Sequence, residues 1–185
     1  MNEELKQALW EGEEVRWSGR PKPFKLLDAH SKTSTVLIWC VSAVILLAVL
    51  VFLVPTAFQG TRSLGDVAIL SAVALFLPGI LSARPLLDKR CLEQQTIYAI
   101  TNYRILAIVK GQVMYLPLGK ELPAAVDSSE GGYGNVRFGE TVGKSVKKSR
   151  VHAVVGLHAE GDVSTTSGLL FYNIDQPEQL LSYLA

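Results

Sequence analysis

Residues 36–54 read VLIWCVSAVILLAVLVFLV, and no side chain in this run of 19 is charged. Fourteen of the 19 residues are Val, Leu, Ile or Phe. A helix of this length spans about 28 Å, close to the ~30 Å hydrocarbon core of a bilayer, and its insertion gains roughly 4–8 kcal/mol. The run therefore predicts a transmembrane helix. The 35 mostly polar residues before it argue against a secretory signal peptide.

A second apolar run, residues 67–83, is shorter and is interrupted by Pro78-Gly79. Its 17 residues span about 25 Å, slightly less than the hydrocarbon core. The span reaches residue 87 if the long side chain of Arg84 extends to the membrane interface. We therefore expect a second transmembrane helix over 67–87, with a short outside loop between the two helices. A re-entrant or interfacial segment is the alternative.

Positive charges flank both apolar runs. They are Arg16, Arg20, Lys22, Lys25 and Lys32 before the first run, and Arg84, Lys89 and Arg90 after the second. The connection between the runs, residues 55–66, holds one basic residue, Arg62. Because basic residues favour the cytoplasmic side, we expect a multi-pass protein of the cell (plasma) membrane with both termini in the cytoplasm. Its parts are a cytoplasmic segment, 1–35, the transmembrane hairpin, 36–87, and a cytoplasmic domain, 88–185.

The composition argues against several classes of function. The net charge of +1 gives no reason to expect nucleic-acid binding. Neither apolar run contains Asp, Glu, Lys or His, the usual groups of proton relays and ion pathways, which disfavours a pump or transporter. Cys40 and Cys91 are interpreted as unpaired thiols. His152 and His158 share an expected strand about 20 Å apart, too far for one metal ion, and no catalytic or nucleotide motif is present. We expect no enzyme activity, no metal and no cofactor.

Residues 88–185 have a mostly β pattern, in which β-branched and aromatic residues alternate with turn residues. The expected strands are 96–100, 104–109, 113–118, 121–126, 135–139, 151–159 and 169–174. A C-terminal helix follows, with Asp175 as its N-cap and Pro177 in its first turn. The expected fold class is α+β, with a two-helix transmembrane hairpin followed by a mostly antiparallel β domain and a C-terminal helix.

Three stretches of this domain resemble bacterial pleckstrin-homology (PH) domains. They are residues 97–106, IYAITNYRIL, the Gly-rich turn 131–134 before 135–138, and residues 171–178, FYNIDQPE. Residues 12–21, GEEVRWSGRP, resemble the lead-in of PH-like membrane proteins of bacteria. The resemblance implies a partly open PH-like β-barrel closed at one end by a helix. It also implies binding or scaffolding rather than chemistry.

A basic cluster is the first candidate site. It consists of Lys144, Lys147, Lys148 and Arg150, in and beside a polar insert at 139–149. Basic groups near an anionic leaflet gain about 1 kcal/mol each, so the cluster could contact anionic lipid head groups or an acidic partner. A solvated loop is the alternative. Arg104, after the turn of the PH-like signature, could pair with a phosphate or an acidic side chain, although bracing the turn is the commoner role for such an arginine.

Three further residues are candidate anchors at the membrane interface: Trp10, Trp17 and Arg84. The two tryptophans lie in the polar N-terminal segment. Each could lie at the membrane interface, belong to a lid over the C-terminal domain, or pack in an ordinary way.

The sequence supports two hypotheses about function. The first is a membrane-anchored PH-like binding or scaffolding module that recruits a membrane protein, a cytoplasmic protein or an anionic lipid at the cytoplasmic face. The second is a structural subunit of a larger membrane complex, which docks through its transmembrane hairpin. In that case Pro78-Gly79 provides a notch for a partner helix.

Overall fold

The computed structural model of the protein describes residues 3–27, 32–53, 55, 59, 63–119, 121–128, 132–144 and 154–184. The chain divides into two compact units, which are treated separately below. The β unit consists of Met1–Phe24 together with Asp88–Ala185, and the helical unit is Lys25–Leu87. The first 24 residues thus belong to the same unit as the C-terminal domain.

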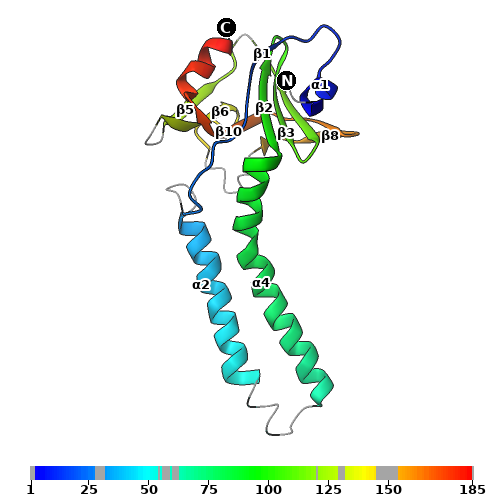
Figure 1. The fold of residues 1–185 in the computed structure, drawn as a ribbon, viewed down its shortest axis with the longest axis vertical. Helices are drawn as coiled ribbons and strands as arrows, with labels where there is room; N and C mark the ends of the chain where they lie inside the picture. Colours follow the sequence, from blue (N-terminus) through cyan, green and yellow to red (C-terminus); the bar gives the residue numbers. More distant parts are fainter. Residues whose placement is uncertain are drawn as a thin grey trace. The chain divides into compact units, whose positions relative to one another are not determined.

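The helical unit contains α2 (Lys32–Ala48), its π-helical continuation η1 (Val49–Leu53) and the larger part of α4 (Leu64–Gln95). Figure 1 shows α2 and α4 side by side and running in opposite directions. Two stretches, Thr35–Phe52 and Gly65–Gln95, are long and apolar enough to cross a membrane. Only 11% of the first and 6% of the second is buried, whereas the core helix of a soluble protein is mostly buried. The two apolar helices expected from the sequence are therefore present.

Two hydrogen bonds join the helices of this unit. The hydroxyl of Ser42 donates to the carbonyl oxygen of Pro78 at 3.4 Å, and the indole N–H of Trp39 donates to the carbonyl oxygen of Ser82 at 3.2 Å. Pro78 is itself buried, so α2 covers the point at which a proline removes a backbone donor from α4. Helix α4 continues through this point as one helix.

The described strands of the β unit form two sheets, and Figure 1 labels most of them. The six-stranded sheet has the order β1 (Val15–Gly19), β2 (Thr96–Thr101), β3 (Arg104–Val109), β4 (Gln112–Pro117), β9 (Val163–Thr165) and β8 (His158–Glu160). The four-stranded sheet has the order β5 (Ala124–Ser128), β6 (Tyr133–Gly139), β10 (Gly168–Asp175) and β7 (Val154–Val155). All neighbours are antiparallel except β4 and β9.

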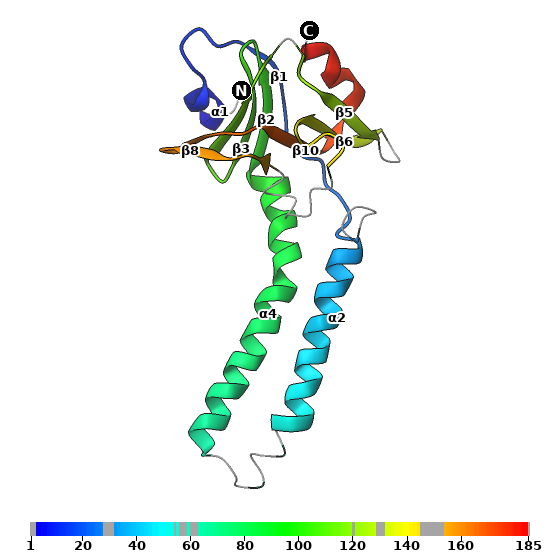
Figure 2. The same ribbon diagram turned by 180° about the vertical axis from the view of Figure 1, so that it is seen from behind.

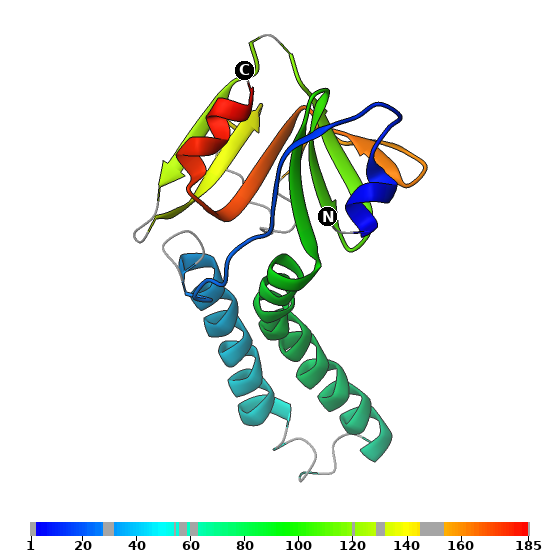
Figure 3. The ribbon, with the colours of Figure 1, turned by 45° about the horizontal axis from the view of Figure 1, so that its top comes forward.

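The α+β class and the mostly antiparallel sheets are as predicted. The resemblance to PH domains implied a partly open barrel, and the described strands do not form a closed one. Within the described residues, no strand of one sheet pairs with a strand of the other. After β10 the chain forms a 3-10 helix, η3 (Pro177–Leu184), which contacts β5 and β6. Figure 3 shows this helix lying across those strands.

The local turn chemistry explains which strands the sequence predicted correctly. Lys110 and Gly111 both have positive φ, 52° and 80°, as a tight turn between β3 and β4 requires. The single strand expected over 151–159 is wrong, because Gly156 has a φ of +65° and the chain turns there. The described residues on either side enter different sheets, β7 and β8.

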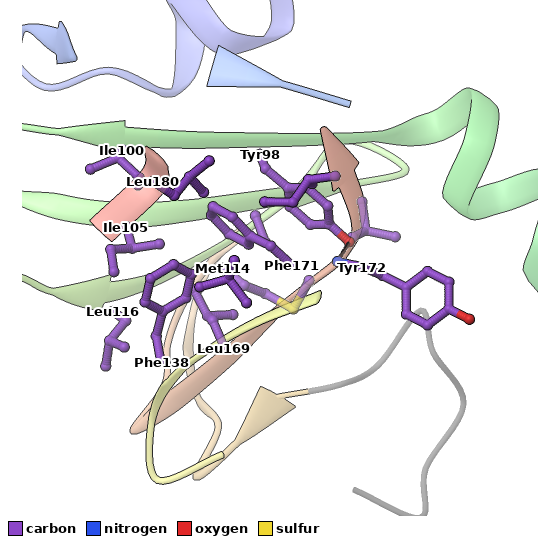
Figure 4. Close-up of a cluster of buried hydrophobic side chains, with 14 of the residues drawn as sticks. Tyr98, Ile100, Ile105, Met114, Leu116, Phe138, Leu169, Phe171, Tyr172 and Leu180 are labelled. Atoms are coloured by element: carbon purple, nitrogen blue, oxygen red, sulfur yellow. Dashed lines mark hydrogen bonds between the residues drawn. The ribbon is translucent and has the colours of Figure 1, made fainter. Parts of the chain in front are cut away.

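The main hydrophobic core lies between the two sheets, and Figure 4 shows its aromatic centre. The ring of Phe171 stacks on Tyr98 with 4.3 Å between centroids, and it meets Phe138 edge-on at 4.9 Å. Leu180 of η3 is buried in the same cluster, which holds the C-terminal helix on the domain. This core therefore needs β2, β6, β10 and η3 together.

A second, smaller cluster covers the opposite face of the six-stranded sheet. Helix α1 (Glu3–Ala8) lies against β2 and β3, as Figures 1 and 2 show. Leu5 is 1% exposed and packs with Ile97, Ala99, Leu106 and Ile108. The N-terminal residues are thus part of the folded domain, and the sheet face that they cover is apolar.

Candidate functional site

A buried ion pair in the β unit joins Arg104 to Glu13. The Nε of Arg104 donates to Glu13 Oε1 at 2.9 Å, and its Nη2 donates to Glu13 Oε2 at 2.8 Å. Nη2 also donates to the carbonyl oxygen of Ala8 at 2.7 Å. Both side chains of the pair are withdrawn from solvent, with exposures of 1% and 0%. Such a two-pronged contact fixes distance and orientation at once.

The turn that precedes Arg104 holds the same segment. The hydroxyl of Thr101 donates to Glu13 Oε1 at 2.7 Å and accepts the backbone N–H of Arg104 at 3.0 Å. Asn102 bonds with Glu14 twice, because its Oδ1 accepts the Glu14 N–H at 3.0 Å and its own N–H donates to the Glu14 carbonyl at 3.1 Å. The lead-in at 12–21 and the signature turn at 101–104 therefore form one interlocked structure.

Trp10 packs against Arg104 and Tyr115. The Cζ of Arg104 lies 3.6 Å from the centroid of the Trp10 ring and 4.9 Å from that of Tyr115. A guanidinium over an aromatic face is attracted by the ring quadrupole. Trp10 also meets Tyr115 edge-on at 5.4 Å and stays 50% exposed. We call residues 3–14 the N-terminal arm, which Glu13 and Trp10 fasten to the sheet.

The carboxyl of Glu13 is held in its charged form. Burial alone raises its pKa, but hydrogen bonds from Arg104, the backbone of Trp10 and Thr101 outweigh that effect and hold the pKa below its ordinary value. With its ionised partner in contact, the guanidinium of Arg104 is engaged within the domain. The structure thus gives Arg104 a bracing role, and it is not part of the binding site that we propose below.

Of the other residues singled out from the sequence, the structure describes Lys144, Arg84 and Trp17. Lys144 is exposed, and its Nζ lies 3.0 Å from Glu140 Oε2. Lys147, Lys148 and Arg150 fall outside the described residues. Arg84 is exposed on α4 in the helical unit.

Trp17 lies on β1 and packs into the main core. Its ring stacks on Phe171 with 6.0 Å between centroids, and the tryptophan is only partly buried. Beyond it the chain continues along β10, since the N–H of Lys22 donates to the carbonyl oxygen of Asn173 at 2.8 Å. The exposed part of Trp17 faces a groove that the sequence did not predict.

This groove, of about 360 Å³, separates β1 from η3. Its lining residues are Trp17, Ser18, Gly19, Arg20, Pro21 and Lys22 on one side, and Asp175, Gln176, Gln179, Leu180 and Tyr183 on the other. Arg16 Nη1 donates to the carbonyl oxygen of Tyr183 at 3.3 Å, and Lys22 Nζ lies 3.7 Å from Asp175 Oδ2. We call it the β1–η3 groove.

The groove combines three kinds of surface. Trp17 and Leu180 supply apolar surface, Gln176 and Gln179 supply amide donors and acceptors, and β1 supplies the backbone of an edge strand. This is a surface suited to non-covalent binding. Sequence reasoning missed the groove because its two walls lie more than 150 residues apart in the chain, and the GEEVRWSGRP stretch was the only signal for one of them.

A second cavity, of about 550 Å³, is lined by Glu4, Arg20, Gln94, Gln95 and Lys110. It lies between the end of α4 and the turn that connects β3 to β4. There the N–H of Lys110 donates to the carbonyl oxygen of Gln95 at 2.9 Å. The C-terminal end of a helix carries partial negative charge, and Glu4 adds to it, so this cavity is poorly suited to an anion. Its two cations complement the helix end instead.

The described part of the chain was considered for metal-binding groups and reactive thiols. No group of three or more His, Cys, Asp or Glu side chains there could hold a metal ion. Cys91 is buried and Cys40 is exposed, and both are free thiols. No protein-family model matches the chain, and neither a curated protein nor a solved structure matches it.

Proposed function

We propose that the protein is a membrane-tethered binding module of the bacterial PH-like kind, which recruits a protein at the cytoplasmic face of the plasma membrane. The apolar helices serve as the anchor, with both termini in the cytoplasm. Tethering raises the effective concentration of the domain near partners in or at the membrane. The domain then acts by binding, without chemistry of its own.

The observation that carries the proposal is the β1–η3 groove. An edge strand beside a helix is a recurrent place for peptide recognition, because the strand offers backbone hydrogen bonds and the helix offers side-chain contacts. Trp17 adds a large and rigid apolar surface at low cost in conformational entropy. The N-terminal arm contributes indirectly, because it precedes β1 in the chain and is fastened by Glu13 to Arg104.

Lipid recognition is a variant of this proposal that rests on the basic cluster. It predicts that the protein's affinity for anionic vesicles falls with added salt and with replacement of Lys144, Lys147 and Lys148 by Ala. Binding that ignores both changes would remove the variant. The contact between Lys144 and Glu140 already uses part of the charge of this cluster.

The second candidate function is a structural subunit that docks through the hairpin. It is favoured by the breadth of exposed apolar surface on α2, η1 and α4, which includes Leu47, Phe52, Phe76 and Ile80. The expected notch at Pro78-Gly79 supports it less, since Pro78 is covered by α2 and bonded to Ser42. Exchanging both helices for an unrelated anchor should abolish assembly if this function is the main one.

Photocrosslinking in native membranes separates these functions. A photoreactive residue at Ser18 probes the groove, one at Leu77 probes the hairpin and one at Lys147 probes the basic cluster. Asp162, in the exposed turn between β8 and β9, provides the matched control. We expect Ser18 to capture a protein that mass spectrometry identifies and that Asp162 does not capture. Capture at Leu77 alone would favour the structural subunit, and lipid captured at Lys147 alone would favour the lipid variant.

A further inference from the structure

We propose that the β1–η3 groove takes an extended, acidic segment of a protein, which adds as one more strand to the edge of β1 that faces away from β2. This inference rests on the proposed binding function of the groove and specifies the chemistry of its ligand. Three observations carry it: the position of β1 in its sheet, the shape of the surface around Gly19, and the balance of charge along the two walls.

The first observation is the position of β1. It is the terminal strand of the six-stranded sheet and pairs on one side with β2. An edge strand directs half of its backbone N–H and C=O groups away from its neighbour, and these are a template for another strand. The opposite terminal strand, β8, has three residues that are all exposed. β1 differs in that it faces η3 across the groove.

The second observation is the shape around Gly19. A Cβ placed on Gly19 would lie 2.7 Å from atoms of the Trp17 ring, so the indole lies against the bare backbone of this residue. The glycine thus makes room for the Trp17 ring beside the backbone of β1. The strand ends immediately after it, because Pro21 has no N–H to continue a ladder. The site therefore suits a short extended segment that passes over the indole.

The third observation is charge. Residues 15–24 carry three basic side chains and no acidic one: Arg16, Arg20 and Lys22. The facing residues 175–184 carry two acidic side chains, Asp175 and Glu178, which leaves a net charge of +1 along the two walls. Asp175 already lies beside Lys22. Gln176 and Gln179 are neutral and do not oppose an anion, so glutamate or aspartate in the ligand is favoured near Arg20.

An acidic peptide fits these three observations better than a lipid does. A lipid head group has no repeating N–H and C=O groups to pair with β1, and it would leave the strand edge unused. A basic peptide could use the edge but would meet Arg20 and Lys22. Backbone pairing with β1 and charge attraction to Arg20 depend on different groups of the peptide, so each can be tested separately.

The test uses the full chain in uncharged phosphatidylcholine nanodiscs and fluorescence anisotropy. The probe is a labelled peptide of about six residues in which glutamate and valine alternate. A first comparison peptide has lysine for glutamate. A second keeps every charge but is N-methylated at alternate residues, which removes the donors along one edge. We expect the acidic probe to bind, and we expect N-methylation on the pairing edge to weaken it at least about tenfold. The lysine peptide should bind no more tightly than the N-methylated peptide.

Protein variants locate the binding. Arg20→Glu should weaken the acidic probe several-fold and improve the lysine peptide. Lys110→Glu makes the same charge change in the second cavity, which Arg20 also lines, and should have little effect. An equal loss in both variants would place the probe in the second cavity and overturn the proposal.

Two further results would also overturn the proposal. One is equal binding of the N-methylated and unmodified acidic peptides, which would mean charge attraction without strand addition. The other is displacement of the acidic probe by anionic vesicles that bind in an Arg20-dependent manner, which would make lipid the occupant. If the acidic probe fails while Ser18 still captures a protein, the groove binds a ligand of different chemistry, and the proposed function stands without this inference.

Discussion

Glu13 and Arg104 lie 91 residues apart in the chain and form a two-pronged, solvent-excluded ion pair with N–O distances of 2.8 and 2.9 Å. This pair fastens the N-terminal arm to the signature turn and so fixes the start of β1. The wall of the β1–η3 groove therefore depends on a contact outside the groove. The arm also covers the apolar face of β2 and β3, against which Leu5 packs.

Breaking the pair should be costly. Arg104→Ala leaves the buried carboxylate of Glu13 without its partner, so the free energy of unfolding should fall by about 3–5 kcal/mol in chemical denaturation. Lys144→Ala, which removes an exposed contact with Glu140, should cost less than about 1 kcal/mol. Replacing both members of the buried pair, Glu13→Leu with Arg104→Met, should cost less than Arg104→Ala alone. Equal costs for Arg104→Ala and Lys144→Ala would contradict the importance of the pair.

The depressed pKa of Glu13 predicts a definite dependence of stability on pH. Because the folded pKa lies below the unfolded value of about 4.3, the unfolded state binds the proton more readily. The stabilisation is present above about pH 4.3 and is lost as the pH falls through the folded pKa. Unfolding measured from pH 7 down to pH 3 should show a smaller loss of stability for Glu13→Gln than for the wild type. Parallel curves would assign the acid sensitivity to other carboxylates.

Gly156 should be much less tolerant of a side chain than Gly161. Both have a positive φ, +65° and +63°, so alanine is strained at either position. A Cβ at Gly156 would also clash with the hydroxyl of Ser167, whereas nothing lies within 4 Å of one at Gly161. We expect Gly161→Ala to cost about 1 kcal/mol and Gly156→Ala about 1–3 kcal/mol more. Thermal unfolding measures both, and adding Ser167→Ala should recover part of the difference if the clash is its cause.

The proposed membrane topology makes a labelling prediction. In a variant lacking Cys40 and Cys91, a cysteine at Gln59 should react with an impermeant maleimide in intact cells. A cysteine at Asp162, which is exposed in the β unit, should react only after the membrane is opened. This pattern follows from the basic flanks on the cytoplasmic side. Labelling of Asp162 in intact cells would reverse the orientation and move the proposed partner outside the cell.

The hydrogen bonds within the hairpin should contribute little to its stability. Ser42→Ala removes the bond to the Pro78 carbonyl, and such interhelical bonds average about 0.6 kcal/mol in membranes. The variant should therefore keep its hairpin, measured as disulfide crosslinking between cysteines placed at Trp39 and Ser82. Loss of the crosslink on Ser42→Ala would show that this bond, rather than packing, holds the helices together.

The amino-acid pattern alone predicts the features that depend on residues close together in the chain. Nineteen uncharged residues long enough for a bilayer predict an apolar helix wherever they occur, because length and transfer energy are local properties. The strands on either side of Lys110-Gly111 were predicted for the same reason, since that turn needs residues that accept a positive φ. The C-terminal helix follows from Pro177 and the leucines after it.

The contacts between distant segments become visible only in the folded protein. No periodicity indicates that Glu13 reaches Arg104, that Val15–Gly19 extends the sheet beside β2, or that β9 pairs in parallel with β4. The groove exists because Trp17 and Leu180 meet across most of the chain length. Such contacts arise from the joint burial of many side chains in one core, and the pattern of any single segment does not encode its partner.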